Sequence, residues 1–155
     1  MSETYDSRID TQQHINRVAA LLEEVAARLR GRGLAHDASK LVSPEREVFD
    51  AVTPRLRGLT YGSPEYKASL ADLGPALEHH YAHNRHHPEH HNAVSCLAGM
   101  TLIDVVEMLC DWKAATERHA DGSIEKSLAH NKGRFHIGDE MHAALVNTAR
   151  EMGWL

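Results

Sequence analysis

The stretch Leu34-Ala-His-Asp-Ala-Ser-Lys-Leu-Val-Ser-Pro-Glu45 decides how the rest of the chain is interpreted. His36 and Asp37 are neighbours within it, so an imidazole nitrogen and a carboxylate oxygen are offered from adjacent positions. Both atoms are good ligands for a hard or borderline divalent cation. Two ligands leave most of a coordination sphere open, so other segments must supply the rest.

Histidines are the first source of further ligands. His14 lies upstream, and seven of the 13 histidines fall between His79 and His91. On a helix, His79 or His80 would share a face with His83, at spacings of three and four. An internal, irregularly spaced tract is not a purification tag. We therefore expect metal or phosphate contact from this tract, with a pH-titrating surface as the alternative.

Late carboxylates are the second source. Asp104, Glu107 and Asp111 are spaced by three and four, which places them on one stripe of a helix. Three carboxylates repel one another unless a cation or a basic partner lies beside them. A solvated acidic face is the alternative. Flanking aliphatic residues and Trp112 favour partial burial of the stripe.

The composition indicates a single all-α domain. The chain has 155 residues, 42% of them hydrophobic and only 5% aromatic, with many Ala and Leu, which favours helices over a sheet. Its net charge of −5 argues against binding to a nucleic-acid duplex. Residues 1–10 are expected to fray, and residues 11–155 to form one bundle of about five to seven helices.

Apolar spacing and start signals predict the following elements. The first helix, 11–30, has Thr11 as its cap, an amphipathic stripe at Ile15, Val18, Leu22, Val25 and Leu29, and an end at Gly31-Arg-Gly33. Further helices are expected from Ser43-Pro44-Glu45 to about Pro54, through Tyr66 and Leu70, through Leu77 to His83, over 94–118 and over 139–152. Residues 123–137 are interpreted as a loop.

The expected packing of the later helices follows from the same patterns. Helix 94–118 should bury Leu97, Ile103, Val106 and Cys110, and the last helix should pack Met141, Leu145 and Met152. Cys96 and Cys110 are predicted to be buried reduced thiols. No signal peptide or membrane-spanning run is apparent, so we expect a cytoplasmic protein with no membrane partner.

The ordered set of these segments resembles the HD-domain superfamily of metal-dependent phosphohydrolases. The matching segments are Gln13-His14-Ile-Asn-Arg-Val, Ala35-His36-Asp37-Ala-Ser-Lys40 and Leu102-Ile-Asp104-Val-Val-Glu107-Met-Leu-Cys-Asp111-Trp. His-Asp-Ala-Ser is similar to the 5′-deoxynucleotidase branch. A closer resemblance is to an uncharacterised bacterial and phage family that shares His-Asp-x-Ser-Lys, an Asn with paired His, and Glu-Met-x-x-Asp-Trp.

The resemblance implies an HD-like helical bundle with a divalent ion held by His14, His36, Asp37 and Asp111, with Asp104 as the alternative to Asp111. The ion could be Mn, Co, Ni, Zn, Mg or Fe. Some HD branches add two histidines and hold two metals, for which His80 and His87 are the candidates here, with one metal as the default. A catalytic role is expected for Asp37, Lys40, His80 and His87, and contact with substrate or with ligands for Lys40, His83, Asn84, Arg85, His86 and Glu107.

The sequence departs from the deoxynucleotidase pattern at Lys40, where that branch has a Glu. Lysine cannot act as a carboxylate base, but it can contact phosphate. We therefore predict a phosphohydrolase that uses a metal-activated water on a nucleotide or a similar small phosphoester. Two alternatives stay open: a non-catalytic metal-binding or interaction protein, and an HD-type iron oxygenase. A homo-oligomer is compatible with each.

Overall fold

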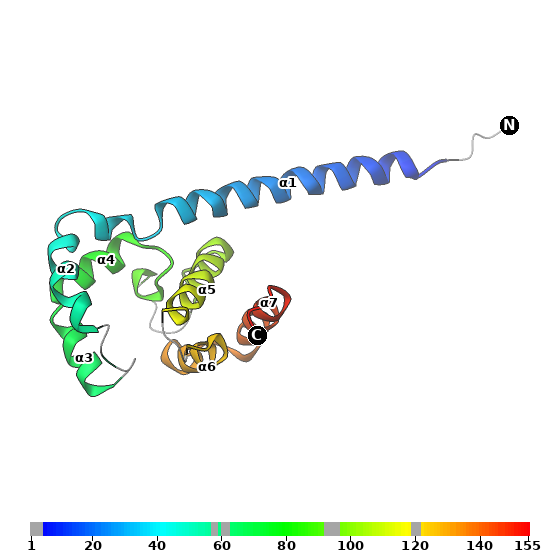
Figure 1. Ribbon diagram of the computed structural model, residues 1–155. Helices are drawn as coiled ribbons and strands as arrows, with labels where there is room; N and C mark the ends of the chain where they lie inside the picture. Colours follow the sequence, from blue (N-terminus) through cyan, green and yellow to red (C-terminus); the bar gives the residue numbers. More distant parts are fainter. Residues whose placement is uncertain (1–4, 57–58, 60–62, 92–96, 119–121) are drawn as a thin grey trace.

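The computed structural model describes residues 5–56, 59, 63–91, 97–118 and 122–155, in which helices joined by turns and short loops are the regular secondary structure (Figure 1). Their order is α1 (Arg8–Ala35), the 3-10 helix η1 (Ala38–Leu41), α2 (Glu45–Leu56), α3 (Pro64–Ala71), α4 (Gly74–His83), the 3-10 helix η2 (Pro88–His91), α5 (Leu102–Thr116), α6 (Ile124–Arg134) and α7 (Asp139–Glu151). The prediction of an all-α chain with five to seven helices is confirmed.

The main apolar core lies among α5, α6 and α7. Among the described residues its buried side chains are Leu97, Val105, Met108, Leu109, Ile124, Leu128, Ile137, Leu145 and Ala149. Helix starts are fixed locally, because Thr101 and Asp104 form a reciprocal capping box at α5 and the Ser123 hydroxyl accepts a hydrogen bond from the Lys126 amide at α6. This core packs against one face of α5, and α5 also carries the acidic stripe of Asp104, Glu107 and Asp111.

A second group of helices, α2, α3 and α4, packs beside η1. Val52, Leu73 and Ala76 are buried apolar side chains among its described residues. Polar groups from α4, η1, α2 and α5 meet between this group and the α5–α7 core. The candidate site described below lies at that junction.

Helix α1 is long and projects from the rest of the molecule, with its N-terminal end far from the other helices (Figure 1). None of its residues is buried, and only Leu29 and Arg32 are half-buried. They lie at its C-terminal end, where α1 packs on α5. The predicted stripe exists, but Ile15, Val18, Leu22 and Val25 are exposed to solvent.

The boundaries of α1 differ from the prediction at both ends. The helix begins at Arg8 rather than Thr11, so residues 8–10 are not frayed, and it continues through Gly31 and Gly33 to Ala35. Glycine has low helix propensity. Here Arg32, between the two glycines, is held by carboxylates of α5 at 2.6 and 2.7 Å, which favours the helical backbone at this point.

Two further predictions about the later helices were wrong. Residues 124–134 form helix α6 rather than a loop, because Ile124 and Leu128, four apart, are buried in the core. Helix α5 begins at Leu102, and the expected residues 94–96 lie outside the described part of the chain. Its core face is Val105, Met108 and Leu109 rather than Ile103, Val106 and Cys110, because the acidic stripe occupies the neighbouring face.

Single side chains also depart from expectation. Cys110 is exposed, which contradicts its prediction as a buried thiol, and Cys96 lies outside the described residues. Met152 is 58% exposed, and Trp154 packs against the core at that end of the chain. None of the described helices is long and apolar enough to cross a membrane.

Candidate metal centre

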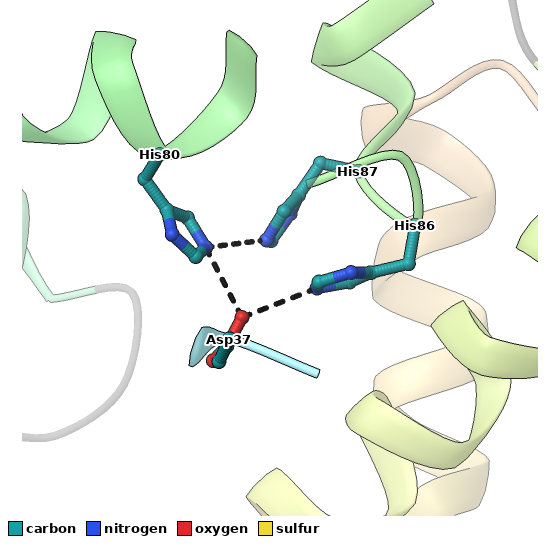
Figure 2. A group of neighbouring side chains, drawn as sticks. All are labelled: Asp37, His80, His86 and His87. Carbon is teal, nitrogen blue, oxygen red and sulfur yellow. Dashed lines mark hydrogen bonds and ion pairs between the residues drawn. The ribbon is translucent and has the colours of Figure 1, made fainter. Parts of the chain in front are cut away.

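Asp37 sits at the turn between α1 and η1. Its backbone is left-handed, with φ 55° and ψ 15°. Aspartate tolerates this region better than most residues, but the conformation still costs energy and persists only where the surroundings fix it. The turn directs the Asp37 carboxylate between the histidines of α4 and of the loop that follows (Figure 2).

Three histidines surround this carboxylate. His80 comes from α4, and His86 and His87 come from the loop after it (Figure 2). Nε2 of His80 lies 3.3 Å from Asp37 Oδ1, and Nε2 of His86 lies 3.6 Å from the same oxygen. Nε2 of His87 lies 2.9 Å from Nε2 of His80. One ligand atom from each of the four residues falls within 4.8 Å of the others.

Two of these atoms lack a hydrogen-bond partner. Asp37 Oδ1 and His86 Nε2 are buried, and neither finds one among the described residues. A buried polar atom without a partner is costly unless something else satisfies it. A carboxylate oxygen and imidazole nitrogens that converge in this way form a donor set that suits a divalent cation. The residues therefore fit a metal ion.

Glu45 orients His80. The Glu45 side chain is fully buried, and its Oε2 lies 2.9 Å from His80 Nδ1. The same carboxylate accepts a hydrogen bond from the Ser39 hydroxyl at 2.9 Å and lies 2.7 Å from His79 Nδ1. When His80 donates its Nδ1–H to Glu45, its Nε2 lone pair is left facing Asp37. This carboxylate–histidine arrangement is the usual support of a metal ligand.

Glu107 has the same relationship with two other histidines. Its Oε1 lies 3.0 Å from His36 Nδ1 and 3.3 Å from His86 Nδ1. Its Oε2 accepts a hydrogen bond from Arg32 Nε at 2.6 Å. Both imidazoles thus face Glu107 with Nδ1 and the interior of the site with Nε2. Glu107 therefore contacts two histidines of the cluster, and its expected role in orienting metal ligands stays a prediction.

His36, His86 and Asp111 form a second group of close ligand atoms. His36 Nε2 lies 3.5 Å from Asp111 Oδ1 and 3.7 Å from Asp37 Oδ2. His86 belongs to both groups, but one imidazole nitrogen has one lone pair and can bind one ion only. The two groups are therefore adjacent parts of one centre, and Asp37 lies between them.

The histidines of the two groups differ in charge. Burial, together with neighbouring His86 and His80, lowers the pKa of His87 to about 3. Burial likewise lowers the pKa of His80 and of His86. These three rings are neutral near pH 7 and can offer lone pairs. His36 differs, because its hydrogen bond with Asp111 raises its pKa to about 9 despite burial.

Burial favours the neutral form of Asp37 and of Asp111, but both carboxyl pKa values lie below the usual range. Lys40 lowers the pKa of Asp37, and His36 lowers that of Asp111. Two neighbouring carboxylates thus remain charged in a half-buried site. This arrangement attracts cations. Of the two groups, the one around Asp37 is better suited to bind a metal ion, because it also has three neutral histidines.

Asp104 is engaged elsewhere. It is fully buried, and its carboxylate accepts hydrogen bonds from Arg32 Nη2 at 2.7 Å, from Arg85 and from Thr101. Burial opposes its charge, yet the hydrogen bonds from Thr101, Arg85 and Arg32 lower its pKa to about 2. With its oxygens occupied by these donors, Asp104 does not join either group, whereas Asp111 does.

Lys40 lies at the edge of the centre. Its Nζ is 2.7 Å from Asp37 Oδ2 and 5.0 Å from the centre of the Phe49 ring. Its side chain is 33% exposed, so part of it reaches solvent. Lys40 is therefore a cation next to the proposed ligands, in the position expected for a contact with an anionic substrate.

His14 does not reach the centre. It is exposed in α1, and the same continuous helix carries the chain from His14 to Ala35. At 1.5 Å of rise per residue, this separates the two positions by about 30 Å. Within one chain, His14 and the His36–Asp37 pair cannot bind one ion. The expected ligand set of His14, His36, Asp37 and Asp111 thus needs a correction, with His80, His86 and His87 in place of His14.

The remaining expected residues have other contacts. Asn84 is buried and donates hydrogen bonds to Ser39 Oγ and the His80 carbonyl, both at 2.8 Å, so its amide holds α4 against η1. His83 is exposed and stacks on His79. Arg85 is 46% exposed and pairs with Asp104 at 3.2 Å. Arg85 thus presents a permanently charged guanidinium at the surface.

Sequence reasoning missed Glu45 and Arg32. Glu45 appeared only as an acid in the first turn of a helix, and Arg32 only as part of a glycine-rich helix end. Their partners His80 and Glu107 are 35 and 75 residues away. A local pattern carries no signal for such pairs. The clue available was that each is a charged residue within nine positions of His36-Asp37.

Comparisons with known proteins identify a family for this chain but give no function. The model of one protein family matches residues 3–152, nearly the whole chain, and the function of that family is unknown. No curated protein and no solved structure matches the chain.

Proposed function

The chain belongs to DUF5662, a family of unknown function, and from its site we propose that it is a metal-dependent phosphohydrolase acting on a nucleotide or a similar small phosphoester. One observation carries this proposal. Asp37, between three neutral histidines, has an unpartnered buried oxygen on one side and the Lys40 ammonium on the other. A cation site and an anion-binding group thus adjoin at one carboxylate.

The proposed ligands are Asp37, His80, His86 and His87, with His36 and Asp111 as the set for a second ion. A bound divalent ion supplies a water of lowered pKa and a Lewis acid for phosphoryl oxygens. Glu45 and Glu107 keep the Nε2 atoms of their histidines directed inward. His86 can bind an ion in only one of the two groups. Metal analysis of the purified protein measures whether one ion or two are bound.

Lys40 is the proposed substrate contact. Phosphoryl transfer depends mainly on positioning and on neutralising charge at the phosphoryl oxygens. The Lys40 ammonium lies beside Asp37 on a partly exposed side chain, so it can donate to a phosphoryl oxygen while Asp37 binds a cation. Arg85, the other accessible cation nearby, is the candidate for a more distant phosphate.

The test is release of phosphate or pyrophosphate from nucleoside mono-, di- and triphosphates, with Mn, Co, Ni, Zn or Mg supplied in turn. Asp37→Asn should abolish release, and Lys40→Met should lower it while leaving metal content unchanged. Asparagine suits this test because it tolerates the left-handed backbone of position 37. Loss of metal from Lys40→Met, or full activity of Asp37→Asn, would contradict the proposal.

A structural or sensed metal is the second candidate, and the burial of the ligands favours it. His80 and His86 are 1% and 2% exposed, as in a closed site rather than an open one. This reading predicts metal binding with no turnover of any phosphoester, and strong destabilisation by chelators. An iron oxygenase, the third reading, is distinguished by iron as the metal in the purified protein.

A further inference from the structure

His79 and His83 lie one turn apart on α4, outside the candidate metal centre. The His79 side chain is 33% exposed, and His83 is exposed. Residues four apart on a helix share a face, and here the two imidazoles stack, with ring centres 3.9 Å apart and planes at 20°. Neither ring belongs to the groups of ligand atoms around Asp37 and Asp111. The surface of α4 thus holds a separate pair of imidazoles.

Each ring of the pair is fixed through its Nδ1 atom. Nδ1 of His79 lies 2.7 Å from Glu45 Oε1, and Nδ1 of His83 lies 2.8 Å from the His79 carbonyl oxygen. Both partners are acceptors, so each neutral ring carries its proton on Nδ1 and its lone pair on Nε2. Neither Nε2 atom has a hydrogen-bond partner among the described residues. Histidines that bind metals through Nε2 are supported in this way, by a carboxylate or a backbone carbonyl at Nδ1.

Glu45 anchors the pair from the interior. Its fully buried carboxylate has Oε1 on His79 and Oε2 on the neighbouring His80, at 2.7 and 2.9 Å. His80 is 1% exposed and faces Asp37, whereas His79 reaches the surface. One buried carboxylate therefore orients a histidine of the closed centre and a histidine of the surface pair. Orientation that is fixed in advance lowers the entropic cost of binding an ion.

We propose that His79 and His83 form a separate metal-binding site at the surface of α4, for a borderline divalent cation such as Zn, Ni or Cu. Imidazoles on successive turns of one helix can bind one ion through both Nε2 atoms after side-chain rotation, and water completes the coordination. Imidazole ligands suit these ions, whereas Mg and Ca prefer oxygen. This site goes beyond the proposed phosphohydrolase activity and does not depend on it.

The surface pair differs from the centre around Asp37 in strength and in access. It has two protein ligands and no carboxylate ligand, and it is open to solvent. We therefore expect it to be filled by added metal rather than to retain an ion through purification. The two sites are distinguished by a probe that reaches only the surface.

The probe is Cu(II) iminodiacetate, added to the full chain and followed by electron paramagnetic resonance. The chelator leaves adjacent positions on the copper open to a pair of imidazoles, and it is too bulky for ligands as buried as His80 and His86. Wild type and Asp37→Asn should both bind one equivalent, with splitting from two imidazole nitrogens. His83→Gln should lose this signal. Persistence of the signal in His83→Gln, or its absence from wild type, would overturn the proposal.

His83 is the residue to change, because its hydrogen bond and its ring contact are both with His79. The contact between Glu45 and His80 is left in place. Glutamine also has good helix propensity, and circular dichroism checks that the variant remains helical. His14→Gln removes another exposed helical histidine and is the matched control, which should keep the full copper signal.

Titration calorimetry tests the class of metal. With Zn, Asp37→Asn should bind one ion more than the double variant of Asp37→Asn and His83→Gln, and with Mg the two proteins should not differ. Equal Zn stoichiometry, or an equal difference with Mg, would contradict the assignment. Zn that both proteins retain would instead concern the centre around Asp37, so failure of the proposed function is seen separately.

Discussion

Glu45 Oε2 lies 2.9 Å from Nδ1 of His80, and both side chains are buried. The contact joins the first residue of α2 to α4, and it leaves Nε2 of His80 facing Asp37. A carboxylate so placed fixes the tautomer and the ring orientation of a ligand without binding the metal itself.

The first prediction concerns this carboxylate. Glu45→Gln should weaken metal binding roughly 10- to 100-fold, because the amide no longer favours the Nδ1–H tautomer of His80. Metal affinity measured by competition with a chromogenic chelator tests this. Glu47→Gln, on the exposed side of the same helix, is the matched control and should bind as wild type does. Equal metal affinity of the two variants would mean that Glu45 does not support metal binding through His80.

The second prediction separates the two late aspartates. Asp111→Asn should reduce metal content or activity with little loss of stability, because Asp111 is a half-buried candidate ligand. Asp104→Asn should chiefly lower the free energy of unfolding, since Arg32, Arg85 and the α5 capping box all depend on its charge. Urea unfolding and metal analysis of both proteins give the comparison. The reverse pattern would identify Asp104 as the ligand.

The third prediction concerns Arg32, which joins α1 to α5. Arg32→Gln leaves Glu107 and the buried Asp104 with one fewer cation, so the free energy of unfolding should fall by about 2 kcal/mol. Arg30→Gln, exposed on the same helix, should change it by less than about 0.5 kcal/mol. Chemical denaturation measures both. A loss for Arg32→Gln no larger than the control would mean that the ion pairs contribute nothing measurable.

The fourth prediction is a pH dependence of the chelator-treated protein. The pKa of His36 is raised to about 9 by its hydrogen bond with Asp111. A raised pKa means that protonated His36 stabilises the fold fully below its ordinary pKa, and that this contribution is lost as pH rises through about 9. Above about pH 7.5 the neutral His80, His86 and His87 contribute no further change, so unfolding free energy should fall by about 1.5 kcal/mol between pH 7.5 and 9.

His36→Gln provides the control for this pH effect. Without the titrating ring, the metal-free protein should lack this fall between pH 7.5 and 9. If wild type and His36→Gln decline in parallel, another group is responsible for the pH dependence.

The sequence predicted the elements that depend on local patterns. Periodic apolar residues and Ser43-Pro44-Glu45 gave α2, α4 and α7 closely, and the spacing of Asp104, Glu107 and Asp111 placed an acidic stripe on α5. The sequence-based prediction failed where contacts between distant residues determine the secondary structure. Gly31 and Gly33 lie inside α1 because Arg32 is held by α5, and α6 is a helix because Ile124 and Leu128 complete the core.

For the site, too, the sequence predicted the residues that belong to local motifs and missed those that depend on distant contacts. His36-Asp37 and the histidine tract are visible as chemistry in the sequence, and the structure brings His80, His86 and His87 to Asp37. That His14 lies about 30 Å away follows only from the continuity of α1. Likewise, the positions of Arg32 and Arg85 determine that Asp104 pairs with arginines, whereas Asp111 is left as the candidate ligand.

The measurement that tests the central claim most directly is the metal content of the purified protein, by mass spectrometry, for wild type, Asp37→Asn and His14→Ala. We predict that wild type and His14→Ala retain the same metal in the same amount and that Asp37→Asn loses it. Retention of full metal content by Asp37→Asn would contradict the assignment of the ion to the cluster of Asp37, His80, His86 and His87.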